Sequence, residues 1–164
     1  MRPLKRLFLR TRRAVRPPHL ALGSFGEAQA LEYLKRAGYK IVAANYRIPL
    51  GRGASGRKIT AEIDIIAYDG GTLVFIEVKT RSSEEFAPAQ TAVDLQKQRQ
   101  IARAAHRYRH VMKVLDEPYR YDVVTVVTGP NGAKVEVLPG YFDDSVFRRG
   151  RYFMLYGSGN PPPF

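Results

Sequence analysis

The chain has 164 residues, 45% of them hydrophobic and 26% charged, which is the length and composition of one globular domain. A net charge of +12, from 27 Lys and Arg against 15 Asp and Glu, points to a polyanion as partner, and the absence of cysteine excludes disulfides, thiolate metal sites and a Cys nucleophile. No apolar run approaches the roughly 20 residues of a membrane span, so we expect a cytoplasmic protein with no membrane partner.

The basic charge is concentrated at the N-terminus. Residues 1–26 hold seven Lys and Arg and no acid, which is more than half of the net charge. A segment this basic and this poor in apolar side chains does not bury enough surface to offset its ordering entropy. We therefore expect residues 1–22 to form a disordered arm, and its charge also suits sequence-independent contact with phosphates.

The first predicted helix follows this arm. Ser24 and Glu27 have the spacing of a capping box, and an apolar stripe then continues to Gly38. The alternating, β-rich residues 39–48 predict a strand. Residues 49–58 hold one proline, three glycines and three basic side chains, which predicts a long flexible loop.

The next two elements form a predicted hairpin. Asp69-Gly70-Gly71 separates two β-rich runs, residues 60–68 and 72–80, and is a strong hairpin signal. A polar, loop-like segment follows over residues 81–90.

One helix and two strands complete the predicted domain. Hydrophobic periodicity places them at residues 91–112, 121–128 and 134–138, respectively. The order α-β-β-β-α-β-β predicts an α/β or α+β domain, with a central mixed sheet flanked by helices, over residues 23–147. A C-terminal extension follows at residues 148–164.

Four ionisable side chains stand in the otherwise apolar hairpin strands. Glu62 and Asp64 lie on one face of the first strand, and Glu77 and Lys79 on one face of the second, because side chains alternate. A turn at Gly70-Gly71 pairs Asp64 with Glu77 and Glu62 with Lys79. A turn at Asp69-Gly70 instead sets Glu62 opposite Glu77, whereas a three-residue turn scatters the cluster between faces.

Either two-residue turn brings carboxylates within about 5 to 8 Å of each other. Like charges so placed destabilise a sheet unless a cation lies between them, and two carboxylates with water are what Mg²⁺ usually accepts from a protein. The competing interpretation is a solvated strand face, with Glu62 and Lys79 as an ordinary cross-strand ion pair.

The order of these motifs along the chain resembles the YraN family. The resemblance rests on Gly26-Glu27, Glu62-Ile63-Asp64, Glu77-Val78-Lys79 and Lys97, and it covers about residues 23–147. That family belongs by fold to the restriction-endonuclease-like, or PD-(D/E)xK, superfamily and is similar to archaeal Holliday junction resolvases.

The resemblance implies a DNA endonuclease that depends on Mg²⁺ or Mn²⁺, with branched DNA as a candidate substrate. Its implied catalytic residues are Glu27, Asp64, Glu77 and Lys79, and its implied metal ligands are Asp64, Glu77 and the carbonyl of Val78. Glu27 is equally well explained as the third helical residue of the Ser24 capping box.

Basic side chains of the second helix are candidate nucleic-acid contacts. Lys97 falls on the apolar stripe of that helix, an unusual position for a charge, and the resemblance makes it a site or phosphate contact. Arg99 and Arg103 lie with His106 and His110 on another face, which suits either phosphate contact or plain solvation.

Two hypotheses for the function follow from these residues. The first is a DNA endonuclease, and the alternative is a non-catalytic nucleic-acid-binding protein with a vestigial nuclease fold. DNA is the expected partner in both. One carboxylate cluster per chain nicks one strand, so cutting both strands predicts a homodimer.

Overall fold

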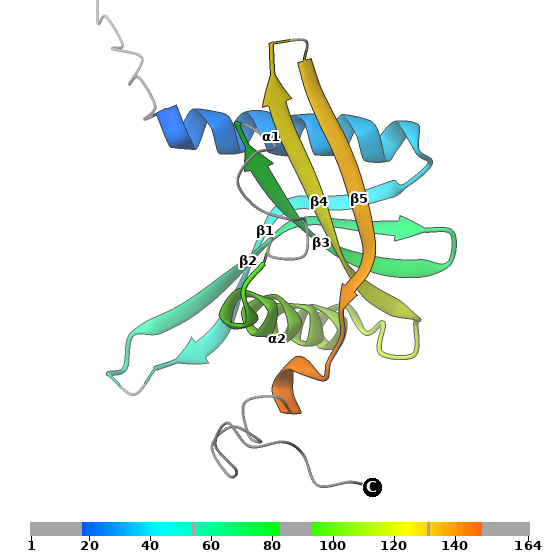
Figure 1. Cartoon of the computed structure of the whole chain (residues 1–164). Helices are drawn as coiled ribbons and strands as arrows, with labels where there is room; N and C mark the ends of the chain where they lie inside the picture. Colours follow the sequence, from blue (N-terminus) through cyan, green and yellow to red (C-terminus); the bar gives the residue numbers. More distant parts are fainter. Residues whose placement is uncertain (1–17, 54, 83–92, 131, 149–164) are drawn as a thin grey trace, which may run out of the picture.

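A twisted five-stranded sheet passes between two long helices (Figure 1). The computed structural model describes residues 18–53, 55–82, 93–130 and 132–148. In chain order the elements are α1 (Pro18–Arg36), β1 (Lys40–Arg52), β2 (Lys58–Asp69), β3 (Thr72–Arg81), α2 (Leu95–Met112), β4 (Tyr119–Gly129) and β5 (Gly132–Phe142).

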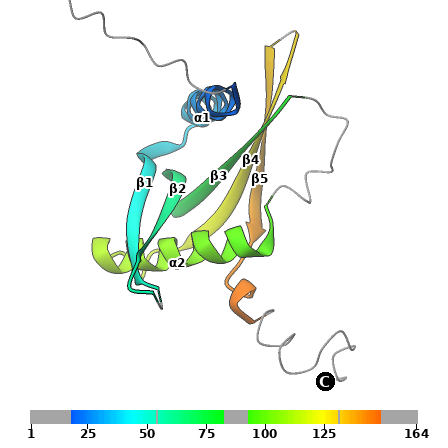
Figure 2. The ribbon, with the colours of Figure 1, turned by 90° about the vertical axis from the view of Figure 1, so that its left-hand side faces the viewer.

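The strands lie in the order β1-β2-β3-β4-β5, which makes β3 the central strand. β3 pairs in parallel with β4, and the other neighbours are antiparallel, so the sheet is mixed. Figure 2 shows the strands running between α1, seen end-on, and α2. This is the α+β architecture that the sequence predicts, a helix-flanked mixed sheet consistent with the restriction-endonuclease-like fold.

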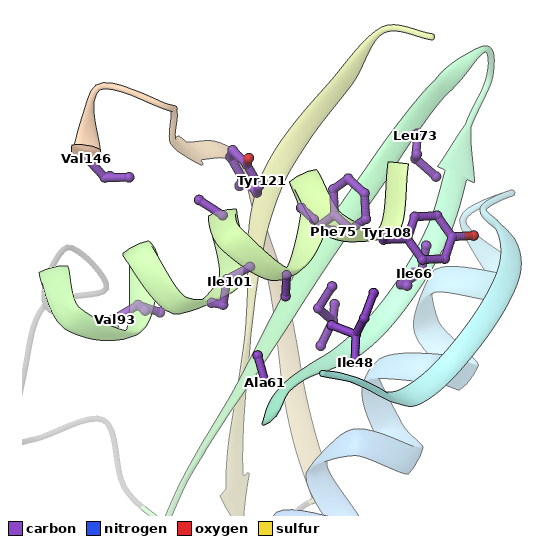
Figure 3. Close-up of a cluster of buried hydrophobic side chains, with 14 of the residues drawn as sticks. Ile48, Ala61, Ile66, Leu73, Phe75, Val93, Ile101, Tyr108, Tyr121 and Val146 are labelled. Atoms are coloured by element: carbon purple, nitrogen blue, oxygen red, sulfur yellow. The ribbon is translucent and has the colours of Figure 1, made fainter. Parts of the chain in front are cut away.

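Each helix buries one face of the sheet. Leu34 of α1 packs with Ile65 and Ile76 on one side. On the other side, the rings of Phe75 in β3 and Tyr108 in α2 pack edge to face, with their centroids 5.6 Å apart (Figure 3). Alternation along β3 therefore sends the odd-numbered residues, from Leu73 onward, towards α2. The same face carries Glu77 and Lys79.

Two local predictions are wrong. The first helix begins at Pro18, where a missing N–H costs nothing, so Ser24 and Glu27 lie inside α1 and do not cap it. Residues 49–58 do not form a long loop. β1 instead continues to Arg52 through a register shift between Pro49 and Gly51, and β2 begins at Lys58.

Part of the predicted N-terminal arm is helical, since α1 starts inside residues 1–22. Residues 1–17 and 149–164 lie outside the described part of the chain. Among the described helices, none combines the length and the apolarity that a membrane crossing requires.

Gly26 lets α1 approach β3 closely. A Cβ atom at this position would lie 1.8 Å from Oγ1 and 2.8 Å from Cβ of Thr80. Thr80 belongs to the same strand as Glu77, so this contact holds the first half of α1, with Glu27, over the end of β3. Only glycine fits here without displacement of the helix.

We predict that Gly26→Ala destabilises the fold by about 1 to 3 kcal/mol, because the added methyl group overpacks the α1–β3 contact. The matched control is Gly23→Ala in the same helix, where a Cβ meets nothing within 4 Å. This control should be neutral or stabilising by up to about 1 kcal/mol. Urea unfolding followed by circular dichroism measures both, and equal free energies of unfolding would contradict the close contact.

Candidate metal centre

The two-residue turn Gly70-Gly71 sets the register of the hairpin. Asp69 pairs with Thr72 across it, and Gly70 adopts a φ of 58°, which an L side chain disfavours. The pairing continues to Ile65 and Ile76 and stops there. The first of the two-residue registers is therefore correct, and it directs Asp64 towards Glu77.

β2 and β3 separate at Asp64, and its carboxylate takes over the position of a ladder bond. Oδ2 of Asp64 accepts a hydrogen bond from the backbone N–H of Val78, at 2.8 Å. In an extended strand the N–H and C=O of one residue point to the same side. The carbonyl of Val78 therefore points to the same gap between the strands as the carboxylate.

A left-handed residue in the neighbouring strand accompanies this separation. Asn45 of β1 has a φ of 53°, and the flanking pairs place it opposite Asp64. On the two sides of Asp64, Ile63 packs towards α2 but Ile65 packs towards α1, so the alternation of faces is interrupted. The prediction that Glu62 and Asp64 share a face is wrong.

Glu62 takes no part in the cluster. Its Oε2 accepts a hydrogen bond from Nε of Arg47 in β1, at 2.8 Å, in an exposed ion pair. The competing interpretation, in which Glu62 pairs with Lys79, is therefore wrong as well. Lys79 contacts Glu77 instead.

Glu77 is a buried carboxylate held between two lysines. Only 4% of its side chain is exposed, and Nζ of Lys79 and of Lys97 each lie 3.0 Å from one of its oxygens. The ammonium of Lys97 is close to Oε2 but out of line for a hydrogen bond, and this oxygen has none from the described residues. Such a charge is stable in the interior only with cations beside it.

Burial, and after it the nearby charge of Glu77, raise the pKa of Asp64 from 3.8 to about 7. The hydrogen bond from Val78 and the charge of Lys97 oppose this rise, and the charge of Glu27 adds to it. Both lysines contact Glu77, so the charge of Asp64 is compensated less than that of Glu77. An additional cation would relieve this repulsion.

The donor set fits Mg²⁺. The site offers two carboxylates and a carbonyl directed into the same gap, and one of the carboxylate oxygens, Oε2 of Glu77, is buried without a hydrogen bond from the described part of the chain. No group of three His, Cys, Asp or Glu side chains among the described residues is arranged to hold a metal. Two carboxylates, a carbonyl and water suit a hard cation, which keeps several waters of its own.

The structure places the other predicted residues as follows. Glu27 is half-buried on α1 and close enough to Asp64 to influence its charge. Lys97 reaches the centre from the first turn of α2. Asp94 caps this helix, because its carboxylate accepts a hydrogen bond from the backbone N–H of Lys97. Arg103 is exposed, whereas Nε of Arg99 donates to the carbonyl of Val146.

Comparison with known proteins assigns the chain to a family. The profile of an uncharacterised protein family, UPF0102, matches residues 26–126, which is more than half of the chain. The chain belongs to the UPF0102 family. The resemblance to the YraN family is thereby confirmed, since the two names denote one family.

Two UPF0102 proteins support the same assignment. A UPF0102 protein of Geobacter metallireducens is 42% identical over 75% of this chain and 93% of the relative. One from Syntrophus aciditrophicus is 38% identical over 76% of this chain and 91% of the relative. A solved structure, SSO0001, aligns with 90% of this chain and 64% of that protein, at 16% identity and a TM-score of 0.40.

Asn45 and Gly26, which lie beside this centre, were not identified from the sequence as residues that position it, although each carries some signal there. Asn45 is one of the few residue types that tolerate the left-handed region, but a single Asn in a β-rich run does not announce an interruption of the strand. Gly26 in an otherwise regular helix pattern is a clearer signal, because a glycine there costs stability unless something packs against it.

We predict that the metal-free protein loses stability as the pH rises from about 4 to about 7. The folded chain binds a proton at Asp64 more tightly than the unfolded chain does, because the pKa is raised from 3.8 to about 7. Asp64→Asn keeps an oxygen for the Val78 N–H and removes the charge. This variant should flatten the slope, and its free energy of unfolding at pH 8 should exceed that of the wild type by about 1 kcal/mol or more.

The measurement is the free energy of unfolding in urea, with EDTA present, at several pH values. Asp116→Asn is the matched control, because it removes the same charge from an exposed site and should leave the wild-type slope. If Asp64→Asn and the wild type have parallel pH profiles, Asp64 is not the buried, repelled carboxylate described here.

Proposed function

We propose that this UPF0102 protein is a Mg²⁺-dependent endonuclease that hydrolyses phosphodiester bonds in DNA, with branched DNA as a candidate substrate. The observation that carries the proposal is the pair of carboxylates at the separation of β2 and β3, one with a raised pKa and the other buried between two lysines. Perturbed carboxylates and lysines gathered where two strands separate are typical of a catalytic centre.

In this mechanism Asp64, Glu77 and the carbonyl of Val78 would hold Mg²⁺. The ion, when bound, polarises the scissile phosphate and makes water a stronger nucleophile near neutral pH. Asp64 and Glu77 must both be ionised for this purpose, so the proton on Asp64 would leave as the site is loaded. Manganese, which accepts similar oxygen ligands, would serve in place of magnesium.

The lysines would have different roles. Nζ of Lys79, which is about one-third exposed, would orient the attacking water or stabilise the negative charge that develops on the phosphate. Lys97 would position the Glu77 carboxylate from the opposite wall. Glu27, on the helix held close by Gly26, would bind a water of the centre.

DNA recognition would use the basic charge around this centre. We assign a phosphate contact to Arg103, which is exposed on α2, and not to Arg99, whose guanidinium binds the segment after β5. Cutting both strands of a duplex would take two copies of the centre, and for that reason we propose a homodimer.

We predict that Asp64→Asn and Glu77→Gln abolish Mg²⁺-dependent cleavage of branched and duplex DNA, because each removes an anionic ligand. Lys79→Ala should still bind DNA and Mg²⁺ but cleave slowly, with a barrier higher by about 2 to 4 kcal/mol. Single-turnover rates at saturating protein, with affinities measured in parallel, separate these effects.

Glu32→Gln is the matched carboxylate control, since Glu32 is exposed on α1 and paired with Arg36 outside the centre. It should cleave at the wild-type rate. A wild-type protein that binds DNA but does not cut it at any concentration of Mg²⁺ or Mn²⁺ would contradict the proposal. The chain would then be a nucleic-acid-binding protein with a vestigial nuclease fold.

A further inference from the structure

The β1–β2 ribbon extends beyond the rest of the sheet and forms a projecting arm. We define the hairpin arm as residues 47–62, from the rung that joins Arg47 and Glu62 to the turn beyond Arg52 and Lys58. The turn is closed by hydrogen bonds from the N–H of Gly53 to the carbonyl of Arg57 and from the N–H of Gly56 to the carbonyl of Gly53. Figure 1 shows this arm at the lower left, on the α2 side of the molecule.

The hairpin arm is strongly basic. It carries four basic residues against a single acid, Glu62, which is neutralised by Arg47. The remaining three cations, Arg52, Arg57 and Lys58, are exposed around the turn. Nη1 of Arg52 donates to the carbonyl of Gly56, which steadies this guanidinium and leaves its other donors for a ligand.

A groove connects the hairpin arm to the metal centre. It has a volume of about 540 Å³ and lies between the arm and α2, lined by Arg47, Thr60, Ala61, Glu62, Lys97 and Gln100. Lys97 lines the groove, and its Nζ also lies 3.0 Å from Oε2 of Glu77, so one side chain borders both the groove and the carboxylates. Arg103 and Arg107, both exposed, follow Gln100 at spacings of three and seven residues and continue this side of α2 beyond the groove.

We propose that the groove and the hairpin arm bind the phosphate backbone of a nucleic-acid strand that extends away from the cleaved bond. This inference rests on the proposed function for the position of the cleaved bond. The cationic tip lies five residues beyond the Arg47–Glu62 rung, or roughly 16 Å along an extended strand. Since successive phosphates of one duplex strand are about 3.4 Å apart in rise along the helix axis, an arm that runs parallel to this axis spans about five of them.

The test is the salt dependence of DNA binding by the full chain, measured by fluorescence anisotropy on a labelled duplex in EDTA. The variant Arg52→Ala/Arg57→Ala/Lys58→Ala should lower affinity by about tenfold at 100 mM salt. It should also reduce the slope of log affinity against log salt by about 2 to 3, because three phosphate contacts no longer release counterions.

The matched control removes three exposed cations from the far end of the molecule, where α1 meets β1, through Lys35→Ala/Arg36→Ala/Lys40→Ala (Figure 1). Affinity should stay within about twofold of the wild type. Equal losses in the two triple variants, or no loss in the arm variant, would overturn the proposal and reduce the arm to general surface charge.

A second measurement locates the contact. Neutral methylphosphonates placed one at a time along the strand should weaken wild-type binding about six positions from the mapped cleavage site, because Lys58 lies six residues from Asp64 along β2, and should not affect the arm variant there. Because the anisotropy assay needs no cleavage, a protein that binds through its arm but never cuts DNA would contradict the proposed function alone. A nuclease whose binding ignores the arm would contradict only this inference.

Discussion

The structure depends on holding the carboxylates of Asp64 and Glu77 close together at the point where β2 and β3 separate. Glu77 is buried on the central strand, and Asp64 faces it across the gap between β2 and β3. Taking such charges out of water is costly, and the raised pKa of Asp64 expresses that cost. Lys79 and Lys97 offset part of it at Glu77. A divalent cation would offset the rest, so the features that strain the metal-free centre are those that would give it affinity for metal.

The rest of the fold holds this arrangement from three sides. Gly26 allows α1 to lie against Thr80, which covers one face of the sheet near the centre and brings Glu27 towards it. On the other face, α2 buries its apolar stripe and supplies Lys97 from its first turn. β1 continues past the core as the hairpin arm, and Lys97 both lines the groove beside this arm and contacts Glu77. Stability and the proposed chemistry therefore depend on the same contacts.

The sequence predicts those parts of the fold and of the site that depend on residues close together in the chain. Asp69-Gly70-Gly71 is a strong turn signal, and it predicted the hairpin but left its register open; the structure selects the Gly70-Gly71 turn, in which Asp69 pairs with Thr72. The charge of Lys97 within an apolar stripe also pointed to an inward contact, which Glu77 provides. The start of α1 was misjudged because Ser24 and Glu27 fit a capping box locally, while packing extends the helix back to Pro18. Residues 49–58 pair across a bulge despite their glycines, and the interruption at Asn45 depends on a neighbouring strand, which no local pattern reveals.

The most direct test of the central claim is a crystal of the protein soaked in Mn²⁺, with anomalous diffraction recorded at the manganese edge. We expect a peak about 2 Å from one carboxylate oxygen each of Asp64 and Glu77 and from the carbonyl of Val78, with Lys79 and Lys97 still lining the centre. A saturating soak that leaves this gap without a peak, or that places manganese only elsewhere on the chain, would contradict the account.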